Sequence, residues 1–249
     1  MKTYQIIFSP TGGTAKVANA LTRKWPETET IDLSDKSISS IVLEEGALAL
    51  IAMPSFGGLA PQLALDRLAA IKANHAKCAI VAVYGNRAYD DTLIQMKDYA
   101  EQAGFSVIAA CSAIAEHSII REYAAGRPDA NDCAELCAFG EQILKKAAAE
   151  NAAGITVPGN KPYKKAGSAM VPSAGSACRS CGACAKKCPA GAIDAANPRK
   201  TNKTNCIGCM RCVSICSEGA RSVNPVMTKI AALVIKKACS EPKKNELMI

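Results

Sequence analysis

Long hydrophobic runs are missing from this sequence of 249 residues, and so is the pattern of a secretory signal. Outside the first half, the longest apolar run is 230–235, far shorter than the roughly 20 residues that cross a bilayer. Residues 1–5 lack the charged, apolar and small-residue order of a signal peptide. We therefore expect a cytoplasmic protein that does not enter a membrane.

Acidic residues are scarce in one half of the chain only. Residues 1–150 carry 14 Lys and Arg against 18 Asp and Glu, whereas residues 151–249 carry 16 against 4. Histidine is scarce throughout, with 2 residues, and aromatic residues make up 4%. The 49% of hydrophobic residues and 21% of charged residues exclude wholesale disorder and fibrous classes.

The cysteines divide the chain at the same place, since eight of the 13 lie between Cys178 and Cys216. In a reducing cytoplasm a cysteine-dense segment is more often a metal site than a disulfide framework. We expect a first domain over residues 1–150, a linker over 151–175, a cysteine-rich domain over 176–226, and a C-terminal helix and tail over 227–249.

Short apolar runs alternate with helical patterns in the first domain, which is typical of a parallel sheet with crossover helices. The predicted strands are 4–8, 29–32, 47–53, 78–84 and 106–113, and the predicted helices are 14–24, 61–71, 91–103 and 131–149. The fold class is therefore α/β, a doubly wound five-stranded parallel sheet with a second, smaller α+β domain. Such sheets bind ligands beyond the carboxyl ends of their strands.

The loop after the first predicted strand reads Ser9-Pro10-Thr11-Gly12-Gly13-Thr14 and opens a helix. Backbone amides at a helix start favour a phosphate, hydroxyls add donors, and glycines allow close approach. The loop is not G-x-G-x-x-G and lacks the G-K-[ST] of a P-loop, which disfavours a Rossmann dinucleotide site and nucleoside triphosphate hydrolysis. An ordinary strand-to-helix turn without a ligand is the alternative.

The loops after the third and fourth predicted strands combine glycine with aromatic rings. One contains Phe56-Gly57-Gly58, and the other begins at Tyr84 and includes Tyr89. In a chain so poor in aromatic residues, rings beside a predicted pocket indicate stacking on a flat conjugated ligand. The alternative is that Phe56 and Tyr84 are core residues at strand ends.

The strongest motif is a duplicated cysteine pattern. The segment Cys178-x2-Cys181-x2-Cys184-x3-Cys188 recurs 28 residues later as Cys206-x2-Cys209-x2-Cys212-x3-Cys216. In bacterial ferredoxins with this spacing, the fourth cysteine of each run ligates the other cluster. The pattern predicts one [4Fe–4S] cluster on Cys178, Cys181, Cys184 and Cys216, and a second on Cys206, Cys209, Cys212 and Cys188. Two zinc sites are the alternative, but zinc ligand pairs are usually separated by longer loops.

These loops and cysteines resemble, over the whole chain, the family of flavodoxin-like domains fused to a C-terminal two-cluster ferredoxin, found mostly in anaerobes. The resemblance implies a flavodoxin-like sheet that binds FMN and a ferredoxin-type second domain. It implies that the phosphate is held by Ser9, Thr11, Gly12, Gly13 and Thr14, and that the ring is surrounded by Ser55, Phe56, Gly57, Gly58, Tyr84, Gly85, Asn86, Arg87 and Tyr89. Gly13 departs from the usual S-x-T-G-N-T loop, which has Asn at that place.

Polar residues follow the fifth predicted strand. His117 could donate a proton near a flavin, but a hydrogen-bonded structural histidine is the favoured interpretation. We expect Arg127 to clamp its loop and Asp129 to cap the helix that follows. Cys133 and Cys137 share a helix face as small hydrophobic residues, in preference to a redox pair or half a metal site.

Neither half contains the motif of a catalytic nucleophile. We predict an electron-transfer protein that relays electrons between FMN, two [4Fe–4S] clusters and a redox partner protein. The alternative is an iron–sulfur flavoenzyme that reduces a small molecule at the FMN. A zinc-stabilised nucleic-acid-binding protein is a third class, which the ferredoxin spacing disfavours.

The charge of the second half bears on the partner. Two clusters of about −2 each would leave residues 151–249, at +12 without clusters, still strongly basic. We therefore expect a partner protein with an acidic docking face, and no nucleic acid.

Overall fold

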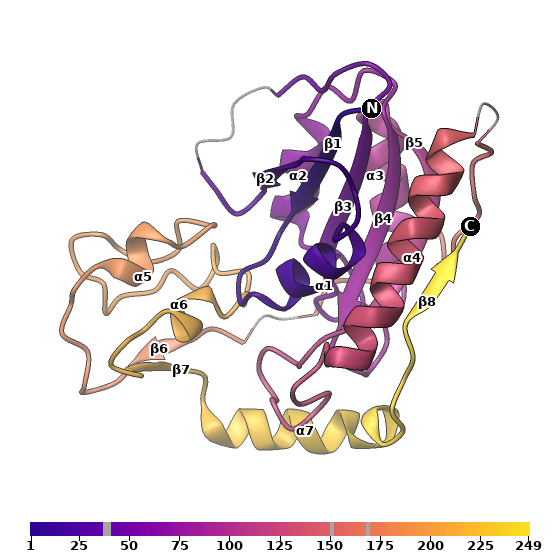
Figure 1. Cartoon of the computed structure of the whole chain (residues 1–249). Helices are drawn as coiled ribbons and strands as arrows, with labels where there is room; N and C mark the ends of the chain where they lie inside the picture. Colours follow the sequence, from indigo (N-terminus) through magenta and orange to yellow (C-terminus); the bar gives the residue numbers. More distant parts are fainter. Residues whose placement is uncertain (37–40, 150–151, 168–169) are drawn as a thin grey trace.

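The computed structural model describes residues 1–36, 41–149, 152–167 and 170–249. A six-stranded sheet forms the centre of its N-terminal part (Figure 1). Its strands are β1 (Thr3–Ile7), β2 (Thr28–Asp32), β3 (Leu48–Pro54), β4 (Lys77–Tyr84), β5 (Ser106–Ile114) and β8 (Glu246–Met248), in the spatial order β2-β1-β3-β4-β5-β8. The first five are parallel, and their 2-1-3-4-5 order is the flavodoxin-like one. The predicted α/β class with five parallel strands is thereby confirmed.

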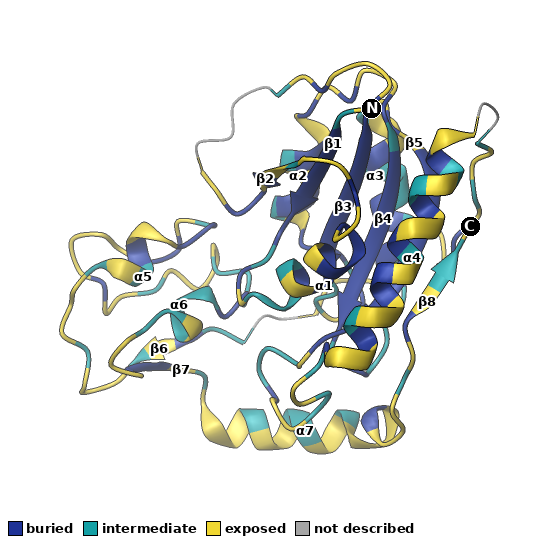
Figure 2. Cartoon of the chain, in the orientation of Figure 1, coloured by how far each residue is buried: buried dark blue, intermediate teal, exposed yellow. Residues whose placement is uncertain are grey.

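Helices cover both faces of the sheet. α1 (Gly13–Leu21) and α4 (Ala130–Ala148) pack on one face, and α2 (Gln62–Ala69) and α3 (Thr92–Gln102) pack on the other (Figure 1). β3 and β4 are buried along nearly their whole length, which is why they read as continuous apolar runs in the sequence (Figure 2). α1 ends at Leu21, before the predicted residue 24, because the chain turns there and Trp25 N donates to Thr22 O.

A sixth strand that the sequence did not predict extends the five predicted ones. β8 pairs antiparallel with β5 at the sheet edge, with Leu247 opposite Cys111. The strand has three residues, which is too short to show a period of alternating burial in the sequence. The C-terminal tail is therefore part of the first domain's sheet.

The segment predicted as a linker packs along α3. Val157 is buried in the core on that side of the sheet. The backbone N–H groups of Asn160 and Lys164 donate to the two carboxylate oxygens of Asp91, at 2.9 and 2.7 Å. Residues 152–164 are thus fixed to the first domain by apolar packing and by hydrogen bonds.

Residues 171–222, here called the cysteine module, form the smaller second unit. It contains β6 (Ser173–Ala174), α5 (Ala183–Lys186), α6 (Arg211–Ser214) and β7 (Arg221–Ser222), and β6 pairs antiparallel with β7. The sequence repeat is visible in the backbone, since Gly182 and Met210, 28 residues apart, both adopt left-handed conformations before a four-residue helix. The predicted smaller α+β unit around the cysteines is present.

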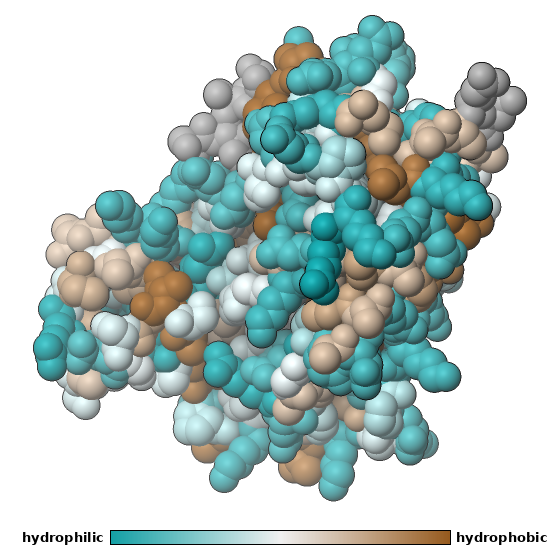
Figure 3. Space-filling view, viewed as in Figure 1, coloured by the Kyte–Doolittle hydropathy of each residue, from teal (hydrophilic) through white to brown (hydrophobic). Residues whose placement is uncertain are grey.

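A long helix, α7 (Pro225–Cys239), leads from the cysteine module back to β8 (Figure 1). Most of it is exposed (Figure 2), and brown atoms mark its place along the lower edge of the space-filling view (Figure 3). The large apolar side chains that it exposes are Val226, Met227, Ile230, Leu233 and Val234. Among the described residues, no helix is both long and apolar enough to span a membrane.

Candidate cofactor sites

The 9–14 loop joins the end of β1 to the start of α1. Gly12 occupies the capping position with φ +94°, a conformation that glycine adopts without strain, and no side chain caps the helix there. Ser9 Oγ accepts the N–H of Ala15 at 2.9 Å, which fixes the loop to the first turn of α1. Thr14 is buried and Thr11 is exposed. A helix start of this kind offers its amides to an anion, so the loop fits a phosphate group.

The 54–61 and 84–91 loops lie against each other. Phe56 and Leu59 exchange backbone hydrogen bonds across Gly57 and Gly58, whose φ values of +62° and +93° suit a tight turn. A Cβ on Gly58 would lie 2.1 Å from Asp90 Oδ2, so only glycine allows this approach. Gly58 O also accepts the N–H of Asp91 at 3.0 Å. The loops that sequence reasoning placed around one ring are therefore neighbours.

The aromatic residues of these loops differ in exposure. Tyr84 is buried at the end of β4, and burial raises the pKa of its hydroxyl to about 12. Its ring packs edge to face on Tyr89, with the centroids 5.3 Å apart. Phe56 and Tyr89 are half-buried. Tyr84 thus fits the alternative of a strand-end core residue, whereas Phe56 and Tyr89 keep part of their rings at the surface.

Asn86 has a role that sequence reasoning missed. Its buried side chain donates to Cys239 O and Glu241 O, each at 3.0 Å, and accepts the N–H of Lys243 at 2.9 Å. The Lys243 ammonium donates to the carbonyl of Arg87, while the Arg87 guanidinium pairs with Asp90. The Asn86 side chain therefore holds the C-terminal tail. No sequence signal links it to partners more than 150 residues away.

His117 packs over the 84–91 loop. A Cβ on Gly85 would lie 2.6 Å from His117 Cβ, so glycine is required beneath the histidine. Nδ1 of His117 accepts the N–H groups of Ile119 and Ile120, at 3.2 and 3.1 Å. Burial, assisted by the charge of Arg87, lowers the pKa of this imidazole. These contacts agree with the structural interpretation of His117.

The start of α4 is a capping box. Asp129 Oδ1 accepts the N–H of Asp132, and Asp132 Oδ2 accepts the N–H of Asp129, both at 2.9 Å. The predicted cap at Asp129 is confirmed. Arg127 clamps the preceding loop as expected, because its guanidinium pairs with Asp132 and donates to Lys243 O at 2.7 Å. Cys137 is buried and Cys133 half-buried on the same helix, in agreement with packing roles.

The two halves of the cysteine repeat make equivalent hydrogen bonds to sulfur. Ala192 N donates to Cys188 Sγ, and Ala220 N donates to Cys216 Sγ, each at 3.3 Å. N–H donors of this kind stabilise a thiolate that ligates a cluster. The fourth cysteine of each run therefore accepts the same backbone hydrogen bond, although Cys188 is buried and Cys216 is half-buried.

Four cysteines that are discontinuous in sequence line one pocket. They are Cys188 from the first run and Cys206, Cys209 and Cys212 from the second, and Pro189, Ile193 and Met210 add apolar walls. Burial, with the other three thiols nearby, raises the pKa of Cys209 to about 11, so a metal would be needed to hold it as a thiolate. Among the described residues, no group of three or more His, Cys, Asp or Glu side chains is arranged so that it could hold one metal ion.

The other predicted ligand set is more open. Cys178, Cys184 and Cys216 are half-buried, and Cys181 is exposed. Arg179, beside Cys178, pairs with Glu218 at 3.1 Å across the two runs. This set lies toward the solvent side of the cysteine module.

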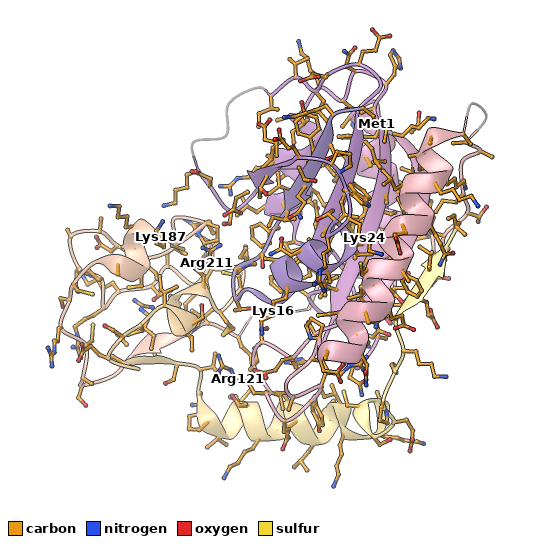
Figure 4. The ribbon with its side chains drawn as sticks, viewed as in Figure 1. Met1, Lys16, Lys24, Arg121, Lys187 and Arg211 are labelled. Atoms are coloured by element: carbon orange, nitrogen blue, oxygen red, sulfur yellow. The ribbon has the colours of Figure 1, made fainter. Side chains whose placement is uncertain are left out.

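The pocket of Cys188 faces the first domain. Arg67 of α2 donates to Pro189 O at 3.0 Å and to Leu33 O at 2.6 Å. Arg211 donates to Ser9 O at 3.3 Å and to Ser34 Oγ at 2.6 Å. Ile207 packs against the core beneath α2 and α3. Figure 4 shows Arg211 between the cysteine module and the sheet.

Comparison with known families places the second unit. Residues 177–221 match the model of the 4Fe-4S dicluster domain. The chain joins a flavodoxin-like sheet to a segment that is similar to the 4Fe-4S dicluster domain. The sheet order supports the first part of this description, and the match over residues 177–221 supports the second.

Solved structures similar to the chain include two flavodoxins and an azoreductase. A Streptococcus pneumonia TIGR4 flavodoxin is 14% identical, with a TM-score of 0.43 over 59% of this chain and 99% of its own. A short-chain flavodoxin associated with a non-canonical PDU bacterial microcompartment is 17% identical, with a TM-score of 0.41 over 59% and 100%. An FMN-dependent NADH-azoreductase from Bacillus anthracis, solved with FMN, is 10% identical, with a TM-score of 0.30 over 59% and 98%. No curated protein matches the sequence.

Proposed function

We propose that this protein transfers electrons, with FMN bound at the carboxyl edge of the sheet and two [4Fe–4S] clusters in the cysteine module. One observation carries the proposal: the pocket lined by Cys188, Cys206, Cys209 and Cys212 lies against the 9–14 loop. A one-electron site and a flavin site would then be neighbours in one molecule. When bound, FMN would supply exchange of one or two electrons, and each cluster exchange of one.

Different residues of the chain would bind the phosphate of FMN, its ring and the two clusters. The phosphate would be held by Ser9, Thr11, Gly12, Gly13 and Thr14, and the ring by Ser55, Phe56, Gly57, Gly58, Tyr84, Gly85, Asn86, Arg87 and Tyr89. Of these, Asn86 would contribute through its backbone, and the buried Tyr84 by supporting the ring of Tyr89. Crossed ligation would assign Cys178, Cys181, Cys184 and Cys216 to one cluster, and Cys206, Cys209, Cys212 and Cys188 to the other.

The partner would be a redox protein with an acidic docking face. Exposed basic side chains of the cysteine module support this, among them Arg179, Lys186, Lys187 and Lys203. A docking face of opposite charge would steer association and make its rate sensitive to salt.

Anaerobic isolation of the full chain tests the cofactors. We expect the iron and sulfide of two cubes together with one FMN per chain. Zinc in place of iron, or flavin-free protein that does not take up FMN, would contradict the proposal. Steady reduction of a quinone, nitro compound or activated alkene without a partner protein would favour an iron–sulfur flavoenzyme instead.

A further inference from the structure

We propose that Arg211 couples the second cysteine pocket to the 9–14 loop, so that FMN binds more tightly when that pocket holds its cluster. The inference rests on the proposed function and adds a dependence of one cofactor on the other. It concerns residues that lie far apart in sequence and touch in the fold.

Arg211 contacts both sites at once. It lies between Cys209 and Cys212 at the first position of α6, and it lines the pocket of these two cysteines. Its guanidinium reaches the first domain and donates to Ser9 O at 3.3 Å and to Ser34 Oγ at 2.6 Å. One residue therefore connects a predicted cluster ligand to the predicted phosphate loop.

The contact continues into the helix that would receive the phosphate. Ser9, whose carbonyl accepts from Arg211, also accepts the N–H of Ala15 through its Oγ at 2.9 Å. The position of Ser9 thus determines how the first turn of α1 is presented. Displacement of Arg211 would release the contact that the cysteine module makes with this loop through Ser9.

The guanidinium is also incompletely satisfied. Nε of Arg211 is buried and has no hydrogen-bond partner among the described residues. A buried donor without an acceptor costs free energy. The guanidinium also places a positive charge close to the 9–14 loop, where this charge would favour the binding of an anion.

Cluster assembly would decide whether this contact exists. A site of cysteine ligands is rarely preformed without its metal, because the metal supplies much of the folding free energy of so small a unit. α6 has four residues and a short loop on either side, so its order would depend on the cluster. By linkage, FMN would in turn raise the affinity of the pocket for its cluster by the same factor.

The experiment measures FMN dissociation constants by flavin fluorescence on the full chain, with clusters assembled and after anaerobic cluster removal. For the wild type we expect cluster removal to weaken FMN binding by about tenfold, within the usual range of coupling between sites. In Arg211→Met the ratio should approach one, because the loaded protein already binds FMN as weakly as the cluster-free wild type. An unchanged ratio in Arg211→Met would overturn the proposal.

Two further variants test whether the coupling depends on the contact between Arg211 and the first domain. Ser34→Ala removes an acceptor of Arg211 on the first domain without changing the cysteine module, and it should also reduce the ratio. This variant decides the matter if Arg211→Met does not assemble its clusters. Arg179→Met, which also removes an arginine beside a predicted ligand, should keep the wild-type ratio because its side chain pairs with Glu218. Loss of coupling in Arg179→Met, or its retention in Ser34→Ala, would contradict the role of Arg211.

A readout without flavin separates this inference from the proposed function. Amide hydrogen exchange over residues 9–15 should slow on cluster assembly in the wild type and change much less in Arg211→Met. If the protein did not bind FMN, the proposed function would fail, whereas exchange would still show whether the loop responds to the cluster. Equal exchange in the loaded and cluster-free wild type would overturn the coupling.

Discussion

His117 illustrates how a candidate for proton transfer becomes a packing residue once its neighbours are known. Its Nδ1 is occupied by two backbone donors, and its side chain lies on Gly85. Protonation of Nδ1 would break both hydrogen bonds, which acts in the same direction as burial. The ring therefore remains neutral where an ordinary histidine begins to take up a proton.

We expect the His117 ring to titrate below about 6.5, the value of an unperturbed histidine. The unfolded chain then binds a proton first as the pH falls below about 6.5, so the free energy of unfolding decreases from there down to the folded pKa. NMR titration of the ring measures the pKa directly. His117→Asn keeps an acceptor for the two amides and should remove this part of the pH dependence. A ring that titrates at or above 6.5 would rule out the structural assignment.

The hydroxyls of the 9–14 loop should distinguish FMN from riboflavin. Thr11→Ala and Thr14→Ala each remove a donor that would serve the phosphate, at a cost of about 1–3 kcal/mol per charge-assisted bond. FMN binding should weaken while riboflavin binding stays the same, as fluorescence titration with both flavins can show. Since Thr11 is exposed, Thr11→Ala should not disturb the fold. Equal losses for the two flavins would place the phosphate elsewhere.

At the scale of elements, the start of α4 is held in place by the hydrogen bonds of one carboxylate, that of Asp132. Asp132 accepts from Arg127, from Asp129 N and from Asn245 Nδ2, and the hydrogen bond from Arg127 is the largest cause that lowers its pKa. A carboxylate with a lowered folded pKa stabilises the fold above its unfolded pKa, and this contribution disappears as the pH falls through the folded pKa.

Asp132→Asn should therefore destabilise the protein by about 1–3 kcal/mol at neutral pH. The difference from the wild type should begin to shrink below about pH 4, the unfolded value, and continue to shrink through the folded pKa. Chemical denaturation at several pH values measures it. Glu141→Gln, on the same helix, breaks an exposed pair with Lys24 and should leave the free energy of unfolding nearly unchanged. A difference that does not depend on pH would show that the Asp132 charge is not involved.

The repeat of the cysteine module makes its two fourth cysteines a matched pair. Cys188→Ala should remove the cluster predicted on Cys206, Cys209 and Cys212, because Cys188 lines their pocket. Cys216→Ala should remove the other cluster. Iron analysis with low-temperature electron paramagnetic resonance distinguishes the two outcomes. Loss of the cluster on Cys178, Cys181 and Cys184 in Cys188→Ala would refute crossed ligation.

Much of the first domain could be predicted because its signals are local. Buried parallel strands appear in the sequence as continuous apolar runs. The helix cap can be recognised because Asp129 precedes Asp132 by three residues, the spacing of a capping box. β8, the tail contacts of Asn86 and the Ser9–Arg211 contact could not be predicted. Each joins residues more than 100 positions apart through one or two polar groups, and no periodic pattern encodes such a pair.

At the scale of the whole molecule, Asn86 is one of the polar links between the first domain and the returning tail. Asn86→Ala removes three hydrogen bonds and leaves buried backbone groups unpaired, so we expect a loss on the order of 1–3 kcal/mol. Hydrogen exchange at 246–248 should accelerate relative to the core of β4. Ser240→Ala, an exposed change beside the tail, should leave that exchange rate unchanged. The same rate in Asn86→Ala would show that β8 is held without Asn86, by its pairing with β5 and by the contacts of Arg127 and Asn245.

The cysteine module is attached to the first domain at both of its ends, by residues 152–164 along α3 and by β8 along β5. A segment with two fixed ends has lost most of its translational freedom before any contact forms, so docking costs it little further entropy. In effect the module meets its site at an effective concentration of the order of millimolar or higher. The contacts at the junction, which include two arginines and one isoleucine, therefore need to supply little binding free energy. Two separate proteins with the same contacts would dissociate on dilution, whereas here dilution has no effect.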